Sequence, residues 1–184
     1  MTPGAHLISS WILATACGCP TRERRLVSLA GVIPDLDGLG IVADVLTRDR
    51  TSLYETYHHV LGHNLAFGML ISMTFAALSP TRKVRVLLLS ALAFHLHLLG
   101  DLVGSRGPDG FQWPIPYLAP FSHSVQLTWQ GQWLLNGWQN NTILAALVLG
   151  SLRVAATRGH SFVEVISTKL DRRLFEMIRP RGSA

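Results

Sequence analysis

The sequence predicts an all-α fold, a helical bundle of about five to seven helices. Five apolar stretches, at about residues 6–19, 26–46, 60–79, 84–105 and 142–157, are separated by charged or Gly/Pro-rich connectors. Leu and Ala dominate these stretches, and none shows the sustained period-two alternation of a half-buried strand. At 184 residues the chain can bury the core of one domain, so we expect a single domain over residues 1–184.

The composition favours association with a lipid membrane. The chain is 48% hydrophobic and 15% charged, and its mean hydropathy is +0.30, which is more apolar than an ordinary soluble domain. The formal net charge of +5 comes from arginines spread along the chain. A specific nucleic-acid partner is therefore not expected, whereas anionic lipid headgroups suit this charge.

The first apolar stretch follows no Lys or Arg, so it lacks the charged start of a secretory signal and we expect it to be retained. Cys17 and Cys19 lie too close together for an easy disulfide and are too few for a structural zinc site. We expect both to be small buried residues.

The second stretch, 26–46, is interrupted by the segment PDLD. Pro34 fixes a bend or a helix start, and Asp35 and Asp37 emerge beside Gly38 and Gly40. Carboxylates in such a turn can reach a metal ion without helical spacing. The alternative is that Asp35 caps the following helix.

The segments 65–79 and 84–105 each approach the length of about 20 residues that a membrane span needs. The basic sequence RKVR, residues 82–85, lies between them and is predicted to form a cytoplasmic hairpin tip. The alternative is a soluble bundle in which these helices form the core.

The connector SRGPDGFQWPIPYLAPFSHS, residues 105–124, is long and aromatic, and three tryptophans follow it. Such residues favour a membrane interface or the rim of a binding cleft. Within the single domain we distinguish a metal-site helical core, 1–140, from a C-terminal part, 141–184, with an apolar helix and an amphipathic helix. The apolar face of the amphipathic helix comprises Phe162, Ile166, Leu170, Leu174 and Ile178.

Ligand-type side chains recur among the apolar residues, in GAHL, VIPDLDGLG, TYHHVLGHNL, FHLHLLGD and FSHS, which hold seven of the eight histidines. On a helix His97 and Asp101 are four residues apart and share a face, whereas His95 points about 160° away. His59 and His63 are also four apart, but His58 would need the helix to start or bend before His63.

A single cation could satisfy several buried imidazoles and carboxylates that otherwise each need a partner. Nitrogen and carboxylate ligands without thiolate favour zinc, with manganese or iron as alternatives.

Taken in order, these motifs resemble the membrane-bound metal-dependent hydrolase family of bacteria. Its members typically show GH, L-P-D-x-D, G-H-R-G-x-T-H-S and S-H-x-x-x-D, and the resemblance covers about residues 4–138. It implies a bacterial inner-membrane location and a fold similar to zinc-dependent phospholipase C and P1 nuclease, with one to three zinc ions. The ligands that it implies are His6, Asp35, His58, His63, His97 and Asp101.

The chain also departs from the family pattern. The arginine and threonine of H-R-G-x-T-H-S are absent. Family spacing selects His58 as a ligand and helix geometry selects His59, so we retain both. His160 and Glu164 have the spacing of the later H-x-x-x-E of phospholipase-type enzymes, but they lie outside the resembling region.

The function expected from this pattern is metal-dependent hydrolysis of a phosphoester such as a phospholipid, through a metal-activated water. One of Asp35 and Asp37 would bind metal, and the other would act as general base or orient a ligand. Arg106 could meet an anionic substrate. His95, Trp113 and His123 are further candidates for substrate contact or for support of the ligands.

Two alternatives remain open at the level of sequence. One is a non-enzymatic membrane protein with a structural metal or a His/Asp network. The other is a small transporter in which His97 and Asp101 relay protons.

Overall fold

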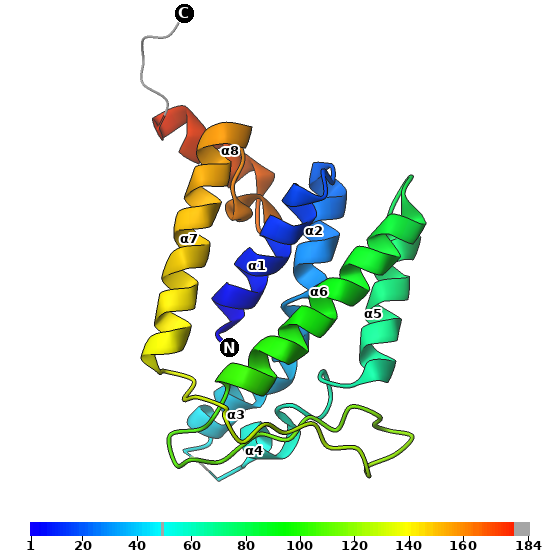
Figure 1. The fold of residues 1–184 in the computed structure, drawn as a ribbon, viewed down its shortest axis with the longest axis vertical. Helices are drawn as coiled ribbons and strands as arrows, with labels where there is room; N and C mark the ends of the chain where they lie inside the picture. The colour runs from blue at the N-terminus through cyan, green and yellow to red at the C-terminus, as the bar shows by residue number, and fades with distance from the viewer. Residues whose placement is uncertain (49, 179–184) are drawn as a thin grey trace, which may run out of the picture.

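The structure is helical, as the sequence predicts. A computed structural model describes residues 1–48 and 50–178, and these residues form eight α-helices, two short 3₁₀ helices and no strand. The longer helices build the bundle; most run roughly along the long axis of the molecule, and the longest crosses it obliquely (Figure 1). They are α1 (Pro3–Ala16), α2 (Thr21–Ala30), α5 (Leu65–Leu78), α6 (Lys83–Gly104) and α7 (Trp138–Arg158).

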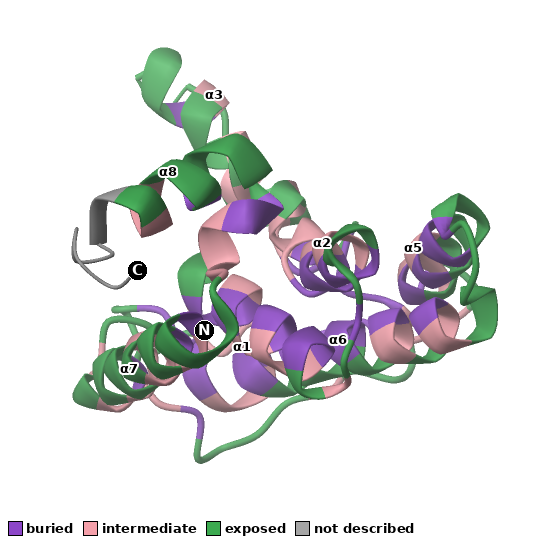
Figure 2. Cartoon of the chain, turned by 90° about the horizontal axis from the view of Figure 1, so that it is seen from above, coloured by how far each residue is buried: buried purple, intermediate pink, exposed green. Residues whose placement is uncertain are grey.

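Helix α6 is the centre of the bundle and packs against α1, α2 and α5. Its buried positions recur every three or four residues, from Val86 through Ser90, Ala93 and His97 to Asp101, so one face of the helix is turned inward. Buried residues gather where α1, α2 and α6 face one another, whereas the outer sides of α7 and α8 (Thr168–Ile178) are exposed (Figure 2). Cys19 is buried in this core and unbonded, as expected, and Cys17 is partly buried.

Helices α5 and α6 form the predicted hairpin. Asn64 caps α5, since its side-chain oxygen accepts a hydrogen bond from the Phe67 N–H at 2.9 Å. Gly68 allows close approach of the two helices, because a Cβ at this position would lie 2.5 Å from the Phe94 ring. The hairpin turns at 79–82, at the end of the bundle that also carries α8 (Figure 1).

The stretch 26–46 divides at the PDLD segment. Helix α2 ends at Ala30, and η1 (Ile33–Leu39) and α3 (Gly40–Leu46) continue in a direction bent by 47°. Pro34 lies in the first turn of η1, where its missing N–H costs no hydrogen bond. A short helix that was not predicted, α4 (Leu53–Tyr57), follows and packs on α3.

The prediction of a helix from residue 60 was wrong at its start. Residues 58–64 form an irregular turn before α5, and His59 has a positive φ of 65°. The four-residue spacing of His59 and His63 is therefore not a helical spacing. Their proximity arises from this turn.

The connector after α6 is irregular, as predicted. Two isolated bridges, Arg106 with Leu134 and Ile115 with Leu127, fold it back on itself. Helix α7 then begins at Trp138 and ends at Arg158, and it is followed by Gly159, whose φ of 71° is a left-handed position that suits glycine.

The predicted amphipathic helix is interrupted. A short η2 (Phe162–Val165) precedes α8 and packs on α2, and Ile166 and Leu170 are exposed. The side chain of Ile178 lies outside the described part of the structure.

Candidate metal centre

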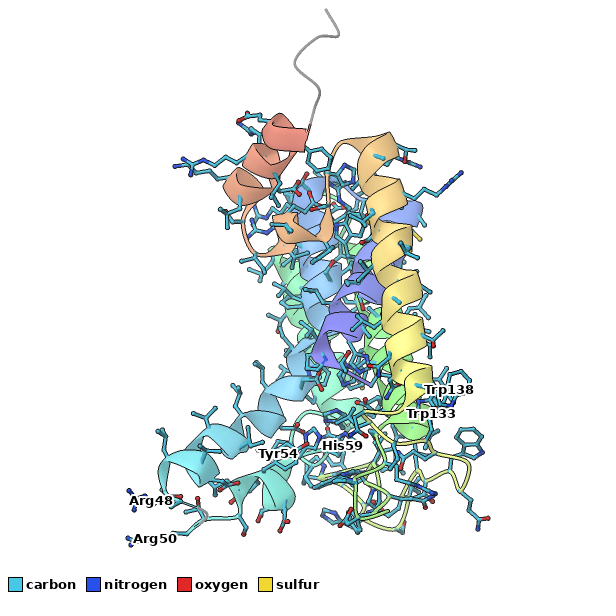
Figure 3. All side chains as sticks on the ribbon, turned by 90° about the vertical axis from the view of Figure 1, so that its left-hand side faces the viewer. Arg48, Arg50, Tyr54, His59, Trp133 and Trp138 are labelled. Atoms are coloured by element: carbon cyan, nitrogen blue, oxygen red, sulfur yellow. The ribbon has the colours of Figure 1, made fainter. Side chains whose placement is uncertain are left out.

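The predicted ligand residues meet at the end of the bundle where α1 begins and α6 approaches its end. The segment around η1 and the turn 58–64 complete this end, beneath which the α3–α4 pair projects (Figures 1 and 3). Figure 3 labels His59 and Tyr54 at this end of the molecule. Four segments that are distant in sequence thus supply side chains to one place.

The inner part of the cluster consists of His63, His97 and Asp101, each at most 1% exposed. The Nε2 atoms of the two histidines are 3.0 Å apart. Oδ2 of Asp101 lies 3.2 Å from Nε2 of His63 and 3.0 Å from Nε2 of His97. Ligand atoms around a tetrahedral zinc ion, with bonds of about 2.0–2.1 Å, lie about 3.3 Å from one another.

The outward-facing nitrogens of both rings are already committed to hydrogen bonds. Nδ1 of His97 is 2.8 Å from the Gly31 carbonyl oxygen, which can only accept, so this nitrogen donates. Nδ1 of His63 is 2.8 Å from Oδ2 of Asp37 and donates to that carboxylate. In the neutral form both Nε2 lone pairs therefore point toward Asp101. Three acceptors that face one another require a cation or an added proton between them.

In the protein without metal, His63 can hold that proton. Burial disfavours the charged ring, but the hydrogen bonds to Asp101 and Asp37 outweigh it and raise the pKa of His63 to about 9.

Three further side chains surround this inner part. Nε2 of His6 is 3.1 Å from Oδ1 of Asp101, and the Met1 amino group contacts the same oxygen. Oδ1 of Asp35 is 3.8 Å from Nε2 of His97, and Nε2 of His59 is 3.8 Å from Oδ2 of Asp101.

Two groups of donor atoms result, each with all atoms within 4.8 Å of one another, and Asp101 belongs to both. Their members are His6, Asp35, His97 and Asp101 in one group and His59, His63 and Asp101 in the other.

His59, and not His58, lies within reach of Asp101. His58 stacks on Tyr54 with ring centroids 4.5 Å apart and directs Nδ1 to Asp37 at 3.2 Å. His59 is 1% exposed, and its Nδ1 has no hydrogen-bond partner among the described residues. Burial and the neighbouring His63 hold the pKa of His59 well below its usual value, so the neutral, metal-binding form prevails.

The two aspartates of PDLD occupy different positions. Asp37 accepts hydrogen bonds from the Gly62 N–H at 3.0 Å and from the rings of His58 and His63. Asp35 joins a donor group through Oδ1, and its Oδ2 has no partner among the described residues. Asp37 thus positions the candidate ligand His63, and Asp35 is the candidate ligand of the two aspartates.

A pocket of about 240 Å³ adjoins the cluster. Its lining includes Asp35, His58, His59 and Asp101 together with the apolar Leu39 and Leu135. Trp113 lies 5.3 Å from His58 between ring centroids and so borders the same area.

The model of the YdjM inner membrane protein family matches residues 1–167. The chain belongs to the YdjM family. No curated protein and no solved structure matches it significantly. The predicted inner-membrane location is thereby confirmed, and the soluble alternative is set aside. The similarity to phospholipase C and to hydrolases stays a prediction.

One helix in the described part of this YdjM-family chain is long and apolar enough to cross a membrane by itself. It is α6, which has a mean hydropathy of 1.9. Its 22 residues correspond to a helix length of about 33 Å, enough to span the hydrocarbon core of a bilayer. The bent combination of α2 with Ile33–Leu46 is a second candidate. The outward face of α6 is a row of exposed apolar residues, Val84, Leu88, Leu92, Leu96 and Leu99.

Several predicted residues do not reach the candidate metal centre. His95 bonds to the Tyr117 hydroxyl at 2.9 Å, and the Arg106 guanidinium donates to the Gln130 carbonyl at 2.8 Å. The exposed His123 has no side-chain contact with the cluster among the described residues.

His160 and Glu164 lie at the opposite end of the bundle. Glu164 accepts hydrogen bonds from Arg24 at 2.7 Å and from the Trp11 indole at 2.9 Å. Its carboxylate therefore forms a buried ion pair that holds η2 on α2, remote from the histidine cluster.

Three residues near the centre were missed from the sequence. The Gly31 carbonyl orients His97, Tyr54 stacks on His58, and Gln132 donates to the Asp101 carbonyl oxygen at 2.9 Å. For Gly31 there was a local signal, because a glycine just before a proline turn marks a change of chain direction. Nothing in the local pattern marks Tyr54 or Gln132.

Proposed function

We propose that this YdjM-family chain is a metal-dependent hydrolase of a phosphoester, such as a phospholipid, at the inner membrane. The observation that carries the proposal is the convergence of the His63 and His97 Nε2 lone pairs on Asp101, with both Nδ1 atoms held by other partners. Ring nitrogens and carboxylates without thiolate suit zinc, and manganese or iron are alternatives. The two donor groups that share Asp101 suit two ions within the expected one to three.

A bound divalent ion would lower the pKa of a coordinated water and stabilise charge on a phosphoryl oxygen. The protein would supply the remaining functions. Asp35 lines the pocket, and its Oδ2 has no hydrogen-bond partner among the described residues. This oxygen would accept the proton of the attacking water. Asp37 would hold the His63 ring in its ligating orientation.

The pocket supports both catalysis and a lipid substrate. A catalytic ion keeps one position open to a cleft, and the pocket beside Asp35 and His59 offers such access. Leu39 and Leu135 would contact the apolar part of a lipid phosphoester.

A structural metal without catalysis is the second candidate, and the burial of His63, His97 and Asp101 favours it. The proton-relay alternative has less support, because the His97 Nδ1–H ends at a backbone carbonyl, which cannot pass a proton onward.

The decisive experiment compares metal content and hydrolysis in detergent-purified wild type, His97→Ala and His95→Ala. His95→Ala is a matched control, since His95 is on the same helix but bonds to Tyr117. We expect metal in the wild type and in His95→Ala, loss in His97→Ala, and parallel loss of hydrolysis of bis(p-nitrophenyl) phosphate and of phosphatidylglycerol vesicles.

Metal without hydrolysis of either substrate, combined with unfolding on chelation, would favour the structural candidate. A folded wild-type protein without metal in zinc-supplemented buffer would overturn both metal proposals.

A further inference from the structure

The Lys and Arg residues gather at the end of the bundle opposite the candidate metal centre. Helix α1 leads away from His6, and α2 returns toward the cluster, so the start of α2 lies at the far end (Figure 1). The α5–α6 turn, the end of α7 and α8 lie at the same end. The basic residues there are Arg22, Arg24, Arg25, Arg82, Lys83, Arg85, Arg153, Arg158, Lys169, Arg172 and Arg173.

The pocket end has the reverse character. Its basic residues in the described part of the chain are Arg48, Arg50 and Arg106. Figure 3 shows the first two at the tip of the α3–α4 projection, and Trp133 and Trp138 near the cluster. The carboxylates at this end are Asp35, Asp37, Asp44, Glu55, Asp101 and Asp109.

This distribution has a physical consequence in a bacterial inner membrane. Lys and Arg in short connectors near the ends of spans are retained on the cytoplasmic side, and Trp and Tyr collect at the interfaces. The connectors at the basic end, 17–20, 79–82 and 159–161, are short and join the helices directly. The connector at the pocket end, 105–137, is also short enough for its charges to count, and it carries a single arginine.

The two arginines of the projection are compatible with this orientation. They follow α3, whose Ile41, Val42 and Leu46 are exposed and apolar. A helix of this kind lies along the membrane interface, where long arginine side chains extend to the headgroups.

We propose that the chain crosses the inner membrane with the α8 end in the cytoplasm and with the pocket end on the outer, periplasmic side. The candidate metal centre would then draw its ion and its substrate from the outer leaflet or from the periplasm. The orientation rests on the charges alone. Only its consequence for the substrate depends on the proposed function.

Cysteine labelling tests the orientation. In a Cys17→Ser/Cys19→Ala background, Thr81→Cys places a thiol in the α5–α6 turn and Ser124→Cys places one in the 105–137 connector, both at exposed positions. Spheroplasts are treated with a membrane-impermeant maleimide before and after permeabilisation. We expect full labelling of Ser124→Cys before permeabilisation and at least tenfold weaker labelling of Thr81→Cys until the membrane is opened.

Lys169→Cys in α8 and Gln130→Cys in the connector, both exposed, repeat the test if either first variant folds poorly. Labelling of the α5–α6 turn before permeabilisation, or protection of the connector, overturns the proposal. The result is independent of hydrolysis: His97→Ala should abolish metal binding and leave the labelling pattern unchanged, so the two proposals can fail separately.

Discussion

Asp37 acts on the candidate centre through the candidate ligand His63. It accepts the His63 Nδ1–H and the Gly62 N–H, so it fixes both the ring and the turn that carries it. Asp37→Asn would remove the charge and turn one acceptor into a donor. We expect metal affinity to fall about 10–100-fold, measured by competition with a chromogenic chelator.

Asp44→Asn is the matched control, because Asp44 caps α4 through the Leu53 and Tyr54 N–H groups and contacts no histidine of the cluster among the described residues. Equal metal affinities for the two variants would show that Asp37 does not position a ligand.

The pair His58 and His59 gives a second prediction at this scale. His59 lies 3.8 Å from Asp101, whereas His58 is committed to Asp37 and Tyr54. His59→Ala should therefore lower metal affinity more than His58→Ala. Isothermal titration with zinc would compare the metal affinities of the two variants. A larger loss in His58→Ala would instead identify His58 as the ligand, as the family spacing implies.

Single residues also show what sequence can resolve. The shared face of His97 and Asp101 was predictable, because α6 is a regular helix and four-residue spacing fixes the geometry. The choices between Asp35 and Asp37 and between His58 and His59 were not. They depend on a turn with a left-handed His59, held by a Gly62–Asp37 hydrogen bond between residues 25 positions apart.

At the scale of elements, the α5–α6 hairpin depends on the absence of a side chain at Gly68. A Cβ there would lie 2.5 Å from the fully buried Phe94 ring, which has little room to move. Gly68→Ala should lower the free energy of unfolding by about 1–3 kcal/mol, measured by denaturant titration in detergent.

Gly4→Ala is the control, since nothing lies within 4 Å of a Cβ added at that helical position. We expect it to be neutral or to stabilise the protein by up to about 1 kcal/mol. Gly68→Ala with wild-type stability would mean that the helix contact is looser than the structure indicates.

The elements that the sequence predicted share a property. Helices α1, α5, α6 and α7 are long and continuous, so apolar composition alone reveals them. Helix α4 has five residues, none of them buried, and it depends on Asp44, nine residues before Leu53. Local patterns do not contain such contacts.

For the whole molecule, the exposed apolar row on α6 implies contact with lipid. Leu92 is near the middle of this helix and is 45% exposed. Leu92→Arg would place a charge at the centre of the membrane, at a cost of about 2.5–3.5 kcal/mol. We expect a smaller carbonate-resistant membrane fraction than for Leu92→Phe. Equal fractions would place this face against protein.

The order of the donors along the chain has a consequence for biogenesis. The two donor groups run from His6 to Asp101, and α7 and α8 contribute to neither. Because synthesis proceeds from the N-terminus, every donor has been synthesised before α7 is made. An ion that joins His6 to Asp101 closes a loop of 95 residues, and the entropic cost of closure grows only with the logarithm of loop length. A metal ion bound at that stage would hold α1 against α6 while the last two helices are still being translated.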